Sequence, residues 1–166
     1  FLTSESQVLH DRAQLEGWKQ FEAGDYRAAI RTFESAAMLD ETDAEARIAT
    51  VFSYVTIGSF RAAYTSLEAT RRRDENIFAH DVSMPGKFGI GTMAQQVRLT
   101  AQGMAEASEQ SAEMKALAIY VLWYMDGKDD ALRAARSLAG KDANRTFADW
   151  PKLMQAALAK PPAKNP

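Results

Sequence analysis

A segment of this chain recurs after 34 residues, and this internal repeat constrains the fold more than any other feature. Residues 24–29 read Gly-Asp-Tyr-Arg-Ala-Ala, and residues 58–63 read Gly-Ser-Phe-Arg-Ala-Ala. Over the 18 positions that start at Gly24, seven residues are identical in the two copies. Unrelated sequences of ordinary composition share about one. A repeat at a fixed short period predicts an array of one structural unit, in which each copy packs against the next.

Each copy of the unit has the pattern of two helices. In residues 5–23, apolar residues recur at spacings of three and four, as they do on one face of a helix. Gly24 follows as a helix-ending residue, and a capping Asp precedes a second helix over about residues 26–39. We therefore predict an all-α chain that begins with two antiparallel helix hairpins, repeat 1 over about residues 6–40 and repeat 2 over about residues 43–74.

The two copies place the same residue types where their helices approach each other. The first copy has Gly17, the turn at 24–26, and Ala29 followed by Phe33; the second has the turn at 58–60, and Ala63 followed by Leu67. This pattern resembles the tetratricopeptide repeat (TPR) family over about residues 10–76. The resemblance implies a short α-solenoid of helix hairpins, a TPR-like right-handed superhelix, that serves as a non-catalytic scaffold for protein-protein interaction.

The rest of the chain departs from the repeat but extends the same single domain, over residues 1–166. An irregular insertion carries Pro85 and several glycines without a helical pattern, so we predict a loop there. The expected parts are an irregular linker at 77–91, a helix at 92–108, a degenerate third hairpin at 112–140, a C-terminal capping helix at about 150–159 and a disordered tail at 160–166.

The resemblance also implies a binding groove. In that family, the first helices of successive units line a concave face that binds peptides or partner helices, and aromatic anchors in such a groove carry much of the affinity. The candidates for this partner-binding groove are Gln14, Trp18, Phe21, Glu22, Glu45, Ile48, Phe52, Val55 and Thr56. The same apolar residues also fit an internal core, with the linker at 77–91 folded back into the groove as an internal peptide.

Composition argues against several other classes of function. The net charge of −2 offers no basic surface for nucleic acid. No apolar run is long enough to span a membrane. The chain has no Cys, and neither His10 nor His80 shows the spacing of a catalytic or metal site. We therefore expect no catalytic residues, no cofactor and no metal.

Two alternatives stay open at this point. The apolar helices at 112–126 and 150–159 are suited to pairing two copies of the chain into a homodimer through Trp123, Tyr124 and Trp150. The turn at 86–92 places a Gly-x-Gly sequence before a helix start, which is an arrangement that can hold a small molecule or an anion.

The compartment is not specified by the sequence. The chain begins at Phe1, and we expect that residues before it have been removed. A soluble cytoplasmic location and export after loss of an N-terminal signal both agree with the absence of Cys.

Overall fold

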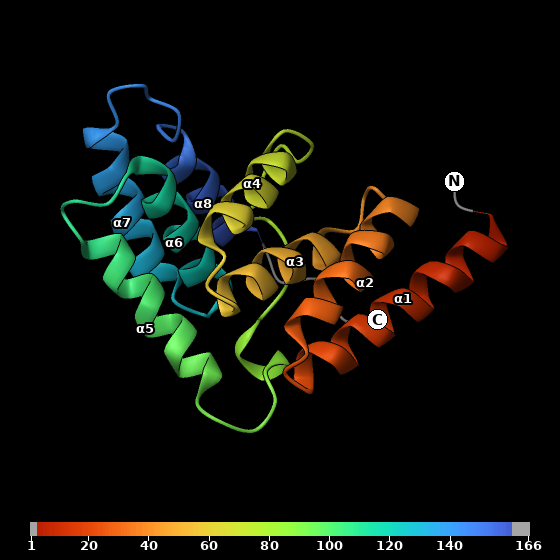
Figure 1. Ribbon diagram of the computed structural model, residues 1–166. Helices are drawn as coiled ribbons and strands as arrows, with labels where there is room; N and C mark the ends of the chain where they lie inside the picture. Colours follow the sequence, from red (N-terminus) through yellow and green to blue (C-terminus); the bar gives the residue numbers. More distant parts are fainter. Residues whose placement is uncertain (1–2, 161–166) are drawn as a thin grey trace.

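The computed structural model describes residues 3–160, and the expected tail beyond Lys160 lies outside them. Within that range the chain forms eight α-helices and one short 3-10 turn, with no strand, so the all-α prediction is confirmed for this part (Figure 1). The elements are α1 (Ser4–Glu22), α2 (Tyr26–Leu39), α3 (Ala44–Thr56), α4 (Phe60–Arg71), η1 (Pro85–Lys87), α5 (Met93–Glu106), α6 (Ala112–Tyr124), α7 (Lys128–Lys141) and α8 (Trp150–Ala159).

Three of the helix-to-helix turns share one geometry. In each, a residue with positive φ ends the first helix: Gly24 at 82°, Gly58 at 76° and Asp126 at 59°. The backbone N–H of the following residue donates to a carbonyl five residues back at 2.9 Å, in the pairs Asp25–Gln20, Ser59–Tyr54 and Gly127–Leu122. This bond satisfies a carbonyl at the helix end. The hairpins α1–α2, α3–α4 and α6–α7 are therefore closed in the same way.

The packing order follows the chain through the first four helices and then changes. Helices α1, α2 and α3 each pack against the helix that follows them. Helix α4 instead packs mainly against α6 rather than against α5. Helix α5 lies beside α6 instead, and α8 covers α7 at the C-terminal end (Figure 1). The stretch between α4 and α5 is therefore an insertion that the third hairpin accommodates.

Helix α6 is buried around its whole circumference. All residues from 116 to 125 are buried, so this helix forms the centre of the C-terminal half. Around it, the ring of Phe78 lies 5.4 Å from that of Trp123 and 5.0 Å from that of Trp150. Trp123, Tyr124 and Trp150 are each about 1% exposed. This corrects the alternative in which these three residues pair two copies of the chain into a homodimer. Their side chains fill the chain's own core and do not reach its surface.

The linking segment, which we define as residues 77–91, is held to α6 by polar contacts as well. Its backbone runs without regular hydrogen bonding, so its buried polar groups need partners elsewhere. The indole N–H of Trp123 donates to the carbonyl of Phe78 at 3.0 Å, and the hydroxyl of Tyr124 donates to the carbonyl of Ile77. The N–H of Met84 donates to the carbonyl of Tyr124 at 2.8 Å. Ile77, Phe78 and Met84 thus form part of the core.

No helix within residues 3–160 combines the length and the apolar character that crossing a membrane requires.

The first hairpin depends on the close approach of two helices at Gly17. A Cβ added there would lie 2.7 Å from the nearest carbon of the Phe33 ring, and Phe33 is fully buried and cannot swing away. We expect Gly17→Ala to lower the free energy of unfolding by about 1–3 kcal/mol, because the overpacked helices must separate. Urea unfolding followed by circular dichroism measures the change.

The matched control for this prediction is Gly103→Ala, in the last turn of α5, where an added Cβ meets nothing within 4 Å. The helix preference of Ala should then stabilise the chain by up to about 1 kcal/mol. Equal effects of the two substitutions would contradict the close approach at Gly17.

Candidate functional site

The predicted groove residues divide into a buried set and a rim. Four of them have side chains that are almost inaccessible to solvent: Phe21, Ile48, Phe52 and Val55. Glu22 is exposed, and the others are half-buried: Gln14, Trp18, Glu45 and Thr56. Phe21 and Trp18 come from α1, whereas Ile48, Phe52 and Val55 come from α3. The face formed by these two helices is thus present, but its apolar part is covered.

Over Phe21 and Trp18, part of the cover comes from residues 85–89 of the linking segment, which we call the covering segment. The ring of Phe88 lies 4.9 Å from the ring of Phe21, and Phe88 is only 7% exposed. The ammonium of Lys87 lies 4.5 Å from the centre of the Trp18 ring, within the range of a cation–π interaction. The same ammonium is 3.6 Å from a carboxylate oxygen of Glu45. A cation and an aromatic ring from one short segment therefore occupy two adjacent places on this face.

The glycine that ends the covering segment lies against the last turn of α1. A Cβ at Gly89 would lie 2.2 Å from the carbonyl oxygen of Glu22, a distance that no side chain can occupy. Ile90, the next residue, is fully exposed. The segment therefore contacts the face over a few residues and leaves it directly after Gly89.

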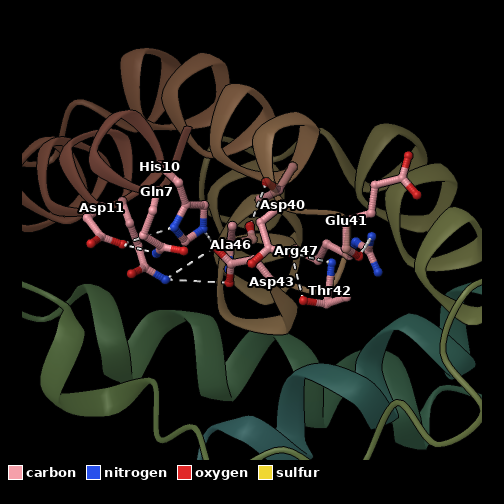
Figure 2. A network of polar contacts seen from close by, with 11 residues as sticks. Gln7, His10, Asp11, Asp40, Glu41, Thr42, Asp43, Ala46 and Arg47 are labelled. Carbon is pink, nitrogen blue, oxygen red and sulfur yellow. Dashed lines mark hydrogen bonds and ion pairs between the residues drawn. The ribbon is translucent and has the colours of Figure 1, made fainter. Parts of the chain in front are cut away.

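A second polar site lies near the start of α1, where the ring of His10 lies between two carboxylates (Figure 2). Its Nε2 is 2.7 Å from Oδ2 of Asp43, and its Nδ1 is 3.2 Å from Oδ1 of Asp11. Asp43 also caps α3 by accepting the N–H of Ala46 at 2.9 Å, and it receives the side-chain amide of Gln14 at 3.3 Å. Gln14, predicted for the groove, thus belongs to this network.

The geometry favours the charged form of His10. Both ring nitrogens face carboxylate oxygens, which only accept hydrogen bonds, so both contacts are hydrogen bonds only when both nitrogens carry a proton. Burial is the largest single influence and lowers the pKa of His10. The hydrogen bonds to Asp43 and then Asp11, with the charges of Asp43 and Asp40, outweigh burial, and the net pKa is raised above 6.5. The sequence contained no local sign of this pair, because 33 residues separate His10 from Asp43.

The residues near the second histidine do not converge on one point. His80 Nε2 pairs with Asp74, whereas the hydroxyl of Ser83 donates to Asp126 at 2.8 Å. A relay of Ser, His and Asp requires each side chain to contact the next, and these do not. In the part of the chain that the structure describes, no group of three His, Asp or Glu side chains gathers closely enough to hold a metal ion.

The turn at 86–92 has little of what an anion site needs. Lys87 is engaged with Trp18 and Glu45 on the other side of the segment. The pocket of about 180 Å³ beside the first turn of α5 is lined by apolar and uncharged side chains, among them Val55, Phe60 and Met93. We find no observation there that favours a small-molecule or anion site.

Comparison with protein-family models found no match, and comparisons with curated proteins and with solved structures found none either. The interpretation of this chain therefore rests on its own residues and geometry.

The raised pKa of His10 makes stability depend on pH in a defined direction. The charged imidazole contributes fully below the unfolded pKa of 6.5, and its contribution is lost as pH rises through the higher folded pKa. We expect the difference in unfolding free energy between the wild type and His10→Gln to be largest below pH 6.5 and to shrink as the pH rises above it. Urea titrations across this range measure it.

The control variant is Asp11→Asn, which removes one of the two carboxylates and leaves the cap of α3 intact. We expect the pH dependence in this variant to be smaller and to move to lower pH, since a hydrogen bond that raises the pKa of His10 is weakened. A His10→Gln difference that stays constant with pH would contradict a charged His10.

Proposed function

We propose that this chain is a non-catalytic protein-interaction module, built as a short solenoid of TPR-like helix hairpins, that binds a short peptide segment of a partner on the face of α1 and α3. The three hairpin turns with the same bonds and the same positive φ support the repeat architecture. In such an array, first helices lie side by side and form one continuous binding face.

The observation that carries the proposal is the covering segment itself. The face of α1 and α3 already holds a short segment, the 3-10 turn η1 followed by extended backbone at Phe88, through side chains that fit separate places: Lys87 on Trp18 and Glu45, and Phe88 on Phe21. A surface that accommodates one such segment in this way has the shape and the chemistry to accommodate another. The covering segment acts as an internal occupant that a partner replaces.

The magnitudes are compatible with replacement. Burial of the Phe88 side chain is worth about 1.5–3 kcal/mol, and an exposed cation–π contact about 0.5–1 kcal/mol. Lys87 and Glu45 are both more than a third exposed, so their ion pair contributes at most about 1 kcal/mol. Residues 77–84 remain fixed to α6 by their own hydrogen bonds and aromatic contacts. A partner therefore has to displace only residues 85–90.

The test is a charge reversal at the rim of the face. We expect Glu22→Lys combined with Glu45→Lys to reduce capture of partner proteins from the source cell at least tenfold, because Glu45 pairs with Lys87 and Glu22 lies against Gly89. Quantitative affinity capture with the tagged chain measures this. The control, Glu75→Lys with Glu109→Lys, makes the same change in net charge at exposed positions away from the face.

The outcomes separate clearly, provided that circular dichroism shows both variants folded. Loss of the captured proteins in the rim variant alone supports the proposal. The same captured proteins with both variants, or none captured by the wild type, would show that this face is not a protein-binding surface.

A further inference from the structure

We infer that the face of α1 and α3 selects peptide segments in which a cationic residue is followed directly by an aromatic residue and then by glycine, and that Lys87, Phe88 and Gly89 are an internal copy of this ligand. The inference deepens the proposed function and rests on it. It commits the site to one class of partner: a protein segment with this three-residue pattern.

The place of the first residue fits a cation. The ammonium of Lys87 lies over the Trp18 ring at 4.5 Å and near Glu45 at 3.6 Å, so a ring face and a carboxylate both attract positive charge. Glu22 adds a second exposed carboxylate at the C-terminal end of α1, where the helix dipole is also negative. The surroundings therefore disfavour an acidic residue and accept Lys or Arg.

The place of the second residue fits an aromatic ring. Phe88 tilts against Phe21 at 4.9 Å, and Phe21 in turn meets Tyr26 edge to face at 5.1 Å. Such pairs of rings add about 0.5–1.5 kcal/mol beyond the burial of their area. An aliphatic residue would lose this contribution, and a polar residue would also lose the burial.

The place of the third residue fits only glycine. Any other residue would bring its Cβ to 2.2 Å from the carbonyl oxygen of Glu22. This oxygen belongs to the backbone, so no side-chain rotation can relieve the clash. The full exposure of Ile90 ends the contact there. Recognition therefore covers three consecutive residues of the peptide. The first must carry a positive charge, the second an aromatic ring, and the third must be glycine.

The chain offers a one-methyl variant that opens the site. Gly89→Ala leaves every residue of the receiving face unchanged but forces the covering segment away from Glu22. Gly86→Ala adds the same methyl group in the same segment, where a Cβ meets nothing within 4 Å. Comparison of Gly89→Ala with Gly86→Ala separates the effect of displacing the covering segment from the effect of adding a methyl group.

The experiment measures binding of a fluorescent peptide with the sequence of residues 84–90, MPGKFGI, to the full chain by polarisation. A tethered segment competes at an effective concentration in the millimolar range, so the wild type and Gly86→Ala should bind weakly. We expect Gly89→Ala to bind at least tenfold more tightly than either. Peptides with Lys87→Glu, Phe88→Ala or Gly89→Ala should each bind at least tenfold more weakly to the opened chain.

Should Gly89→Ala fail to fold by circular dichroism, the double variant Lys87→Ala with Phe88→Ala opens the same site by removing the two anchors. Absence of binding to a folded opened variant, or equal binding of all the peptides, overturns the inference. If partner proteins depend on the rim carboxylates but the peptide does not bind, the inference fails and the proposed function stands. If the peptide binds but no partner protein is captured, the proposed function fails and the peptide specificity stands.

Discussion

The structure depends on how the linking segment satisfies its backbone while it crosses the interior. An irregular chain inside a core has polar groups that must find partners, or each costs about 1–3 kcal/mol. Side chains and backbone of α6 supply them: Trp123 and Tyr124 donate to the carbonyls of Phe78 and Ile77, and the carbonyl of Tyr124 receives Met84. These bonds fix the third hairpin against the first two and determine where the segment emerges on the face of α1.

The segment consequently has two parts of different strength. Ile77, Phe78 and Met84 of residues 77–84 are buried, with Phe78 packed on the large ring of Trp150, and separating them from α6 would open the C-terminal core. Residues 85–89 are held through Phe88 and Lys87 and end at a glycine beside an exposed residue. Local opening in proteins begins where buried apolar contacts are few. The more weakly held part therefore lies on the face of α1 and α3.

Sequence reasoning succeeded where the determinants are local. The first two hairpins could be predicted because Gly24 and Gly58 occupy left-handed positions that favour glycine. The third was less distinct because Asp126 takes that conformation instead. The apolar residues of α6 have the same pattern whether they face a second copy or a core, so their burial under Phe78 could not be read from spacing. The His10–Asp43 pair and the contact of Phe88 with Phe21 join residues far apart in the chain, and no periodicity encodes such contacts.

The position of the covering segment in the chain has a consequence during synthesis. Ribosomes build proteins from the N-terminus at about 5–20 residues per second, so roughly three to thirteen seconds pass between the addition of Phe21 and that of Phe88. The first two hairpins make mostly contacts between neighbouring helices and can form in that interval. Until the later residues emerge, the nascent chain presents an uncovered aromatic surface. This surface is then open to chaperones and to other unfolded chains, and the arrival of Phe88 ends that exposure.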